Sequence, residues 1–313
     1  MLTAEALKRK IQSADDLLSV VKTMKALAAV SIRQYQRAVE SLADYYRTVE
    51  MGLQIVLRDR RGIITGARAG TRAALLGAVV FGSDQGLCGQ LNNIIAQHAL
   101  EEMDKTGIPR ENRIVIAVGM RVADILEDSG QKVFEILATP GSTAGITAMV
   151  QDITLVMESW RFKNSVENMR LYYNEYLSGA TYRPQTLKLL PVDRDWLLTL
   201  KRRRWESRTI PMFTMEWERI FRSLIREYLF VSIYRSFANS LASENASRLA
   251  AMQNAEKNIE ERLEELDVQF HRQRQMTITE ELLDIVAGFE AMKEDVNVAK
   301  PGKKARRRAA EHL

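Results

Sequence analysis

The sequence has a single cysteine, Cys88, and only three histidines in 313 residues. One thiol cannot form an internal disulfide or a multi-cysteine zinc site, so we expect a reducing compartment. The histidines, at positions 98, 271 and 312, are scattered without ligand spacing, which argues against a metal site. Cys88 could act as a nucleophile only with a nearby base, and His98, ten residues farther along, is a weak candidate for that base. We therefore expect neither a cofactor nor a catalytic residue.

The sequence also has no long hydrophobic run. Its longest stretch without a charged residue, 136–151, contains Pro140, two glycines and several hydroxyl side chains. It falls short of the ~20 apolar residues that a transmembrane helix requires. The first ten residues already carry charges and belong to a periodic helix, which leaves no room for a signal peptide. We therefore expect no direct membrane insertion.

Glycine and proline are missing from long stretches at both ends of the chain. Residues 1–51 contain neither, and residues 211–292 contain one proline, at the start, and one glycine, near the end. From Ile220 to Phe270, apolar residues recur at the ~3.5-residue step of a supercoiled helix, with charges between them. The first stretch follows the same step, so both ends of the chain predict long coiled-coil helices.

The lengths of these two helices suggest that they pair. A continuous helix over 211–292 would span ~120 Å, whereas a compact chain of this size has a radius of gyration of only ~19 Å. Such a helix must project and needs a partner, and the first helix, ~75–80 Å long, is the obvious one. Two helices of an ordinary bundle remain the alternative, but sustained heptads at both ends favour an antiparallel coiled coil.

Residues 72–192 have a different pattern, in which short apolar runs alternate with helical spacing. This alternation is typical of a mostly parallel sheet with helices on its faces, so we predict an α/β domain inserted between the two long helices. The last two strands indicate a hairpin at a sheet edge. We predict strands at 75–81, 113–118, 133–137, 167–177 and 182–192, and helices at 90–103, 121–128 and 141–160.

The predicted organisation has four parts. These are a coiled-coil helix at 1–57, the α/β domain at 72–192, a second coiled-coil helix at 210–292 and a basic, disordered tail at 293–313. Residues 58–71 are rich in glycine and predict a loop. Residues 193–209 form a basic connector, after which Pro211 is expected to open the long helix, where proline is tolerated.

The charge balance is mildly basic, with a formal net charge of +5. Much of the excess lies in the last dozen residues, and a second basic run occupies residues 201–204. These basic runs keep an alternative interpretation open, in which the chain is a coiled-coil scaffold or a nucleic-acid-binding protein that uses the basic tail. An α/β enzyme with a helical appendage is less favoured, because the middle domain lacks any acid/base constellation. The excess of cations along the first helix fits either a solvated face or a track for an acidic partner.

The most distinctive local stretch is 81–92, which reads Phe-Gly-Ser-Asp-Gln-Gly-Leu-Cys-Gly-Gln-Leu-Asn. A strand, a glycine-rich turn and a helix can present backbone N–H groups to an anion. However, the stretch lacks the Gly-Lys-Ser/Thr of a Walker loop and the Gly-x-Gly-x-x-Gly of a dinucleotide fingerprint. We therefore favour a tight structural or partner-docking turn over a nucleotide site.

Four segments resemble motifs of one family. Residues 240–255 and 274–288 resemble the carboxyl-terminal signature of the gamma subunit of F-type ATP synthases. Residues 82–89 resemble that family's Ser-Asp-x-Gly-Leu-Cys-Gly turn, and residues 21–29 resemble its amino-terminal helix. The four segments occur in the family's order and cover nearly the whole chain, which makes their combination far more specific than any one of them.

The resemblance implies a central rotor shaft whose antiparallel coiled coil lies inside a ring of three alpha and three beta subunits. Its α/β domain would form a foot, docked with the epsilon subunit on the c-ring. Ion flow would turn the shaft, which would drive the beta catalytic sites through different nucleotide affinities. The subunit itself would perform no chemistry and would bind no nucleic acid. It would be a peripheral membrane protein on the cytoplasmic face of a bacterial inner membrane.

The resemblance also implies particular site residues. The positions that match the family's contacts with the alpha and beta ring are Met24, Lys25, Arg248, Arg274, Gln275, Thr279 and Glu281. The positions that fall in the foot, toward the c-ring or the epsilon subunit, are Ser83, Asp84, Gly86, Cys88 and Gly89. Gln85 and Gln90 stand where the family commonly has arginine and glycine. These departures and the basic tail suggest a divergent bacterial lineage, such as the sodium-translocating N-type ATPases.

Overall fold

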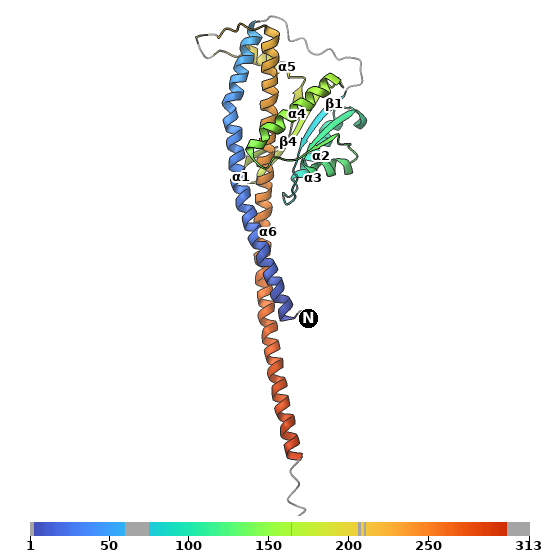
Figure 1. Ribbon diagram of the computed structural model, residues 1–313, viewed down its shortest axis with the longest axis vertical. Coiled ribbons are helices and arrows are strands. Elements are labelled where there is room, and N and C mark those ends of the chain that lie inside the picture. Colours follow the sequence, from blue (N-terminus) through green and yellow to red (C-terminus); the bar gives the residue numbers. More distant parts are fainter. Residues whose placement is uncertain (1–2, 60–74, 164, 206–207, 210, 299–313) are drawn as a thin grey trace, which may run out of the picture. The chain divides into compact units, whose positions relative to one another are not determined.

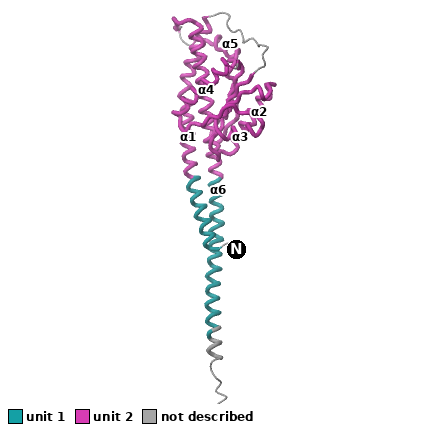
Figure 2. The backbone as a smooth tube through the Cα atoms, turned by 45° about the vertical axis from the view of Figure 1, so that its right-hand side comes forward, with its two compact units in different colours: residues 1–21, 255–313 teal, residues 22–254 magenta. Residues whose placement is uncertain are grey.

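The computed structural model describes residues 3–59, 75–163, 165–205, 208–209 and 211–298. The chain divides into two compact units (Figure 2). The larger unit is Lys22–Asn254, and the smaller unit combines Met1–Val21 with Ala255–Leu313. Residues 60–71 of the predicted loop and residues 299–313 of the predicted basic tail lie outside the described residues. The prediction of a disordered tail from residue 293 is wrong for residues 293–298, which continue the last helix.

The larger unit contains a five-stranded sheet with the order β3-β2-β1-β4-β5. Its strands are β1 (Leu76–Phe81), β2 (Arg113–Val118), β3 (Glu135–Leu137), β4 (Asn168–Ser178) and β5 (Thr181–Leu190). Neighbouring strands are parallel except for β4 and β5, which form an antiparallel hairpin at one edge. The prediction of a mostly parallel sheet with an edge hairpin is therefore confirmed.

Helices cover both faces of this sheet (Figure 1). On one face, α2 (Leu91–Asp104) and α3 (Met120–Asp128) pack on Ala78, Val80 and Tyr172. On the other face, α4 (Thr143–Lys163) and the middle of α6 (Trp217–Val298) pack on Val79 and Phe81. Successive side chains of β1 alternate between the two cores, as the period of a strand requires. A short 3₁₀ turn, Arg110–Asn112, precedes β2.

The two long helices, α1 (Ala4–Asp59) and α6, flank the sheet domain in the sequence. In the larger unit they run antiparallel, because Tyr45 donates from its hydroxyl to Glu227 Oε2 at 2.6 Å while Gly52 lies against the side chain of Leu224. In the smaller unit, their segments also lie side by side (Figures 1 and 2). The predicted fold, an α/β domain inserted between two long helices, is confirmed.

The structure adds two features that the sequence did not suggest. The basic connector contains a helix, α5 (Arg194–Arg202), which begins where the Asp193 side chain accepts a hydrogen bond from the Asp195 N–H. Leu197 and Leu200 hold this helix in place, because both are buried in a cluster between α1 and α6. In addition, α6 begins at Trp217, later than the proline at which we expected it to open. Among the described residues, no helix combines the length and apolar character needed to span a membrane.

Candidate functional site

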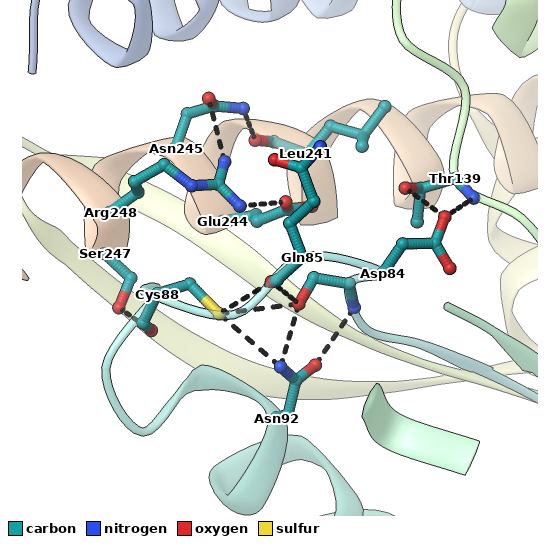
Figure 3. A network of polar contacts seen from close by, with 11 residues as sticks. Asp84, Gln85, Cys88, Asn92, Thr139, Leu241, Glu244, Asn245, Ser247 and Arg248 are labelled. Atoms are coloured by element: carbon teal, nitrogen blue, oxygen red, sulfur yellow. Dashed lines mark hydrogen bonds and ion pairs between the residues drawn. The ribbon is translucent and has the colours of Figure 1, made fainter. Parts of the chain in front are cut away.

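The turn between β1 and α2, residues 82–90, is held by hydrogen bonds around Ser83. The Ser83 N–H donates to Asn92 Oδ1 at 3.0 Å, and the Asn92 amide donates to Ser83 Oγ at 2.8 Å. The same amide lies 3.5 Å from Cys88 Sγ, which is itself 3.4 Å from Ser83 Oγ (Figure 3). Ser83 and Cys88 are both buried, so the polar groups of the turn satisfy one another.

The Ser83 backbone also requires a glycine on the neighbouring loop. Gly119 has a φ of 106°, and a Cβ added there would lie 2.6 Å from the Ser83 carbonyl carbon. Only glycine adopts this conformation without strain and allows this approach. The loops that follow β1 and β2 are therefore packed backbone against backbone.

Asp84 ties this turn to the ends of two other strands. Its carboxylate accepts hydrogen bonds from the Thr139 N–H at 2.6 Å, the Thr139 hydroxyl at 2.8 Å and the Met120 N–H at 2.9 Å. Asp84, Met120 and Thr139 follow β1, β2 and β3, at the carboxyl edge of the sheet, where open α/β sheets usually bind ligands. A fixed carboxylate repels a phosphate there and occupies the donors that an anion would need. The geometry therefore favours a structural or docking turn over a nucleotide site.

Helix α6 docks on this domain through serine hydroxyls that donate to backbone carbonyls. Ser247 Oγ donates to the Cys88 carbonyl at 2.6 Å, and Ser243 Oγ donates to the Asn174 carbonyl at 2.9 Å. The Tyr182 hydroxyl also lies 3.3 Å from Ser247 Oγ. These serines are four residues apart and so share one face of the helix. The turn at Cys88 is thus attached directly to α6.

An apolar contact accompanies these hydrogen bonds. Phe237 of α6 meets Phe81 of β1 edge-to-face, with ring centroids 5.0 Å apart. Both rings are almost completely buried, and Ser240, one turn farther along, donates to the Phe81 carbonyl at 3.4 Å. Along the face of α6 that meets the sheet, the aromatic contact of Phe237 is therefore followed by the hydroxyl contacts of Ser240, Ser243 and Ser247.

Glu244 and Arg248, one turn apart on α6, form a buried ion pair beside this face. Arg248 Nη2 donates to Glu244 Oε1 at 2.6 Å, with side chains 10% and 8% exposed. Burial raises the pKa of the Glu244 carboxyl, Arg248 opposes this rise, and the negative charge of Asp84 adds to it. Burial also raises the pKa of Tyr35 on α1, and Glu244 contributes to that rise. Within the described part of the chain, Glu244 Oε2 and Arg248 Nε have no hydrogen-bond partner.

The structure places the predicted site residues in two groups. The larger unit contains the five turn residues, together with Met24, Lys25 and Arg248. It places Arg248 near the turn (Figure 3), because its neighbour in the sequence, Ser247, donates to the Cys88 carbonyl, although the resemblance assigned Arg248 and the turn to different partners. Met24 and Lys25 are half-buried on α1. The remaining four residues, Arg274, Gln275, Thr279 and Glu281, are exposed on α6 in the smaller unit.

Sequence reasoning missed several residues of this network. It did not single out Asn92, Thr139, Ser243, Glu244 or Ser247 as site residues. The serines had a detectable signal, because small hydroxyl residues at steps of three and four follow one helix face. The other contacts join residues far apart in the sequence, so no local pattern predicts them.

The carboxyl-terminal part of α6 exposes an apolar strip in the smaller unit. The strip consists of Ile278, Leu282, Leu283, Ile285, Val286, Phe289 and Met292. Leu282 is 60% exposed and Phe289 is 62% exposed, so the described residues cover neither of them. A contiguous exposed apolar surface of this kind marks an interaction site.

Comparisons with known proteins identify the family. A family model described as ATP synthase matches residues 3–292. The ATP synthase gamma chain of Desulfitobacterium hafniense is 26% identical over 297 residues, which cover 93% of this chain and 100% of the relative. That of Buchnera aphidicola subsp. Diuraphis noxia is 24% identical over 295 residues, covering 93% and 99%. Among solved structures, the rotor of the Euglena gracilis mitochondrial ATP synthase has a similar fold, with a TM-score of 0.62, 16% identity and coverage of 88% and 98%. The chain belongs to the gamma-chain family of ATP synthases.

Proposed function

We propose that this chain is the central shaft of an F-type ATP synthase and couples rotation of a c-ring to the catalytic cycle of the beta subunits. The relatives are named as ATP synthase gamma chains, and a protein of similar fold is an ATP synthase rotor. In this role the chain transmits torque through α1 and α6 and carries out no chemistry. Its partners are three alpha subunits, three beta subunits, an epsilon subunit and the c-ring.

The apolar strip of α6 is the observation that carries this proposal. Its residues belong to a helix of 82 residues, yet nothing in the described part of the chain covers them. Burying an apolar side chain of this size is worth ~1.5–3 kcal/mol, so seven exposed ones strongly favour a surrounding partner. A ring of alpha and beta subunits supplies an enclosing surface, whereas a scaffold or nucleic-acid-binding protein does not require one.

The exposed polar residues near the strip are the proposed contacts with that ring. Arg274, Gln275, Thr279 and Glu281 lie within two turns of α6, and all four are exposed. The Thr279 hydroxyl donates to the Gln275 carbonyl at 2.8 Å, which fixes its direction along the helix. These groups can hydrogen-bond to the ring while the strip buries its apolar surface.

Three further residues complete the proposed ring contacts, namely Met24, Lys25 and Arg248. The hydrogen bond to Glu244 already holds the Arg248 guanidinium in one orientation. Arg248 would therefore not have to be reoriented to contact a partner subunit. We assign the turn residues Ser83, Asp84, Gly86, Cys88 and Gly89 to the foot, toward the c-ring or the epsilon subunit. Their attachment to α6 supports a role in moving the foot together with the shaft.

The proposed location follows from the complex. ATP synthases are membrane-bound, so we propose a peripheral position on the cytoplasmic face of a bacterial inner membrane. The relatives above are bacterial, which supports a bacterial source. Membership of a divergent N-type lineage remains a prediction.

Isolation of the complex tests the proposal. The tagged chain should recover alpha and beta subunits from its own membranes, with three of each per copy, together with the c-ring. The untagged strain serves as the control for adventitious capture. Recovery of the chain alone, or together with nucleic acid in a salt-sensitive manner, would contradict the proposal.

A further inference from the structure

A long groove lies within the larger unit, between α4, the junction of β5 with α5, and the first turns of α6. Its volume is about 730 Å³. Its α6 wall runs from residue 216 to residue 233, which is ~26 Å at 1.5 Å per residue. A helix of about 17 residues has the same length, whereas a small molecule would fill only part of it. None of the ring and foot contacts proposed above lines this groove.

The floor of the groove is apolar and belongs to the core of the larger unit. It is formed by Met157 of α4, Met169 of β4, Leu189 of β5 and Ile233 of α6, each of which is buried. Phe162, at the end of α4, also lines the groove but is 84% exposed. Aromatic residues, methionine and arginine are enriched at protein–protein interfaces. The groove can therefore bury apolar side chains of a partner.

The walls of the groove carry more cations than carboxylates. The lining includes five arginines and three glutamates, which gives a formal charge of +2 (5 − 3). Two of the arginines are paired, because Arg226 Nη2 lies 2.9 Å from Glu158 Oε1 and Arg222 Nη2 lies 3.6 Å from Glu218 Oε2. Among the described residues, the other three form no ion pair, namely Arg161, Arg194 and Arg219.

These three arginines lie on different walls of the groove. Arg161 is in the last turn of α4, Arg194 is the first residue of α5 and Arg219 is in the first turn of α6. All three side chains are exposed. Because their charges are distributed around the groove and do not meet at one point, they suit several separate carboxylates better than one compact anion.

We propose that this groove binds an acidic amphipathic helix of a partner protein. The apolar face of that helix lies on the floor of the groove, with anchors at the i, i+3 or i+4, and i+7 positions that helix-in-groove recognition uses. Its carboxylates lie along both flanks, opposite the three arginines. The same charges repel a basic helix, so the walls select for an acidic one. A fatty acid could occupy the floor, but its single carboxylate would leave the other arginines without a partner.

Binding of model peptides to the purified full chain tests the proposal. The first probe is a labelled peptide of about 17 residues, with leucines at helical spacing and glutamates on its other faces. The second probe has lysines in place of the glutamates, and the third has the composition of the first with the leucine spacing scrambled. Fluorescence anisotropy should show that the first probe binds most tightly and that added salt weakens its binding.

Hydrogen exchange locates the bound peptide. Exchange should slow in segments that cover residues 154–162 and 216–233, because these form two walls of the groove. The same measurement separates binding in the groove from binding to the apolar strip of α6 or to the basic residues at the end of the chain. It requires no variant.

Substitutions then assign the binding to particular side chains. Phe162→Ser should weaken binding of the first probe about tenfold or more, because it removes an apolar contact. Leu155→Ser is the matched control, since Leu155 is 64% exposed on the same helix but does not line the groove. Removing the charge of Arg161, Arg194 or Arg219 by substitution with Gln should weaken binding about two- to fivefold each. Arg121→Gln, at an exposed position on α3, controls for the loss of charge and should leave binding unchanged.

Several results would overturn the proposal. The basic or the scrambled peptide would bind as tightly as the first probe, or exchange would slow only outside the groove. The control variants would weaken binding as much as the groove variants. Oleate would slow exchange at the groove while the first probe would not, which would assign the groove to an acyl chain. None of these results depends on whether the chain assembles into a rotor.

Discussion

Breaking the buried ion pair of α6 should destabilise the larger unit severely. Arg248→Met removes one partner of a pair whose side chains are 10% and 8% exposed, and so leaves the Glu244 carboxylate buried without its cation. Such a change costs ~3–5 kcal/mol, because the remaining charge has lost its solvent and its partner. Replacing both residues, as Glu244→Leu with Arg248→Met, removes both charges and should restore most of this loss. The expected coupling between the two sites is therefore ~2–4 kcal/mol.

Tryptophan fluorescence provides a selective assay for this effect. All four tryptophans lie between residues 22 and 254, so urea unfolding followed by their emission reports on the larger unit. Arg226→Met is the matched control, because Arg226 also pairs with a glutamate, Glu158, but is 67% exposed. It should cost no more than ~1 kcal/mol. A loss below ~1 kcal/mol in the Arg248→Met variant, or a double variant as unstable as the sum of the single ones, would refute the reasoning.

Three further predictions concern the turn, the pH response and the apolar strip. Gly119→Ala should lower the free energy of unfolding by ~2 kcal/mol or more, whereas Gly86→Ala, which meets no atom within 4 Å, should change it little in the same fluorescence assay. Burial raises the pKa of the Glu244 carboxyl above its ordinary value of 4.5. The stability of the wild type relative to Glu244→Gln should therefore be greatest below pH 4.5 and should fall as pH rises through the folded-state pKa. Urea unfolding at several pH values measures this change. Leu282→Asp and Phe289→Asp should leave this unfolding unchanged but abolish recovery of alpha and beta subunits; intact recovery would show that the strip does not meet the ring.

Much of the sheet was predictable because its strands are short apolar runs. The β2 sequence Arg-Ile-Val-Ile-Ala-Val is rich in β-branched residues and matches the predicted bounds 113–118. The β4–β5 hairpin was equally visible, because alternating residues flank a Ser-Gly turn. Local pattern was sufficient here, because a short apolar run bounded by turn residues indicates a strand whatever residues later bury it.

The start of α6 and the existence of α5 were less predictable. Proline is favoured in the first turn of a helix, but nothing in the local sequence requires the helix to begin there. The charge of residues 201–204 suggested a solvated connector and obscured the spacing of Leu197 and Leu200, which dock against α1. Their burial depends on a helix roughly 140 residues away in the sequence, as the contact between Arg203 and Gln54 illustrates with its separation of 149.

The candidate site was likewise predictable only in part. The turn was noticed because of its glycines, but its partners could not be predicted. Heptad spacing indicated that α6 has one partner helix, whereas in the larger unit α6 meets α1 and the sheet together, so residues between 236 and 248 are buried on nearly every side. Glu244 and Arg248 resembled surface charges in the sequence, since a heptad pattern assigns charged positions to solvent. Only the second contact surface explains why they are buried.

The serine contacts of α6 have a consequence for how the family can vary. Their acceptors are the backbone carbonyls of Phe81, Cys88 and Asn174, and a carbonyl is present whatever side chain occupies the position. Substitutions in the sheet domain can therefore accumulate without removing the acceptors, provided that the backbone path is kept. On the helix, by contrast, each contact disappears with its hydroxyl. The docking of shaft and domain thus places its sequence requirement almost entirely on α6 and leaves the domain free to diverge.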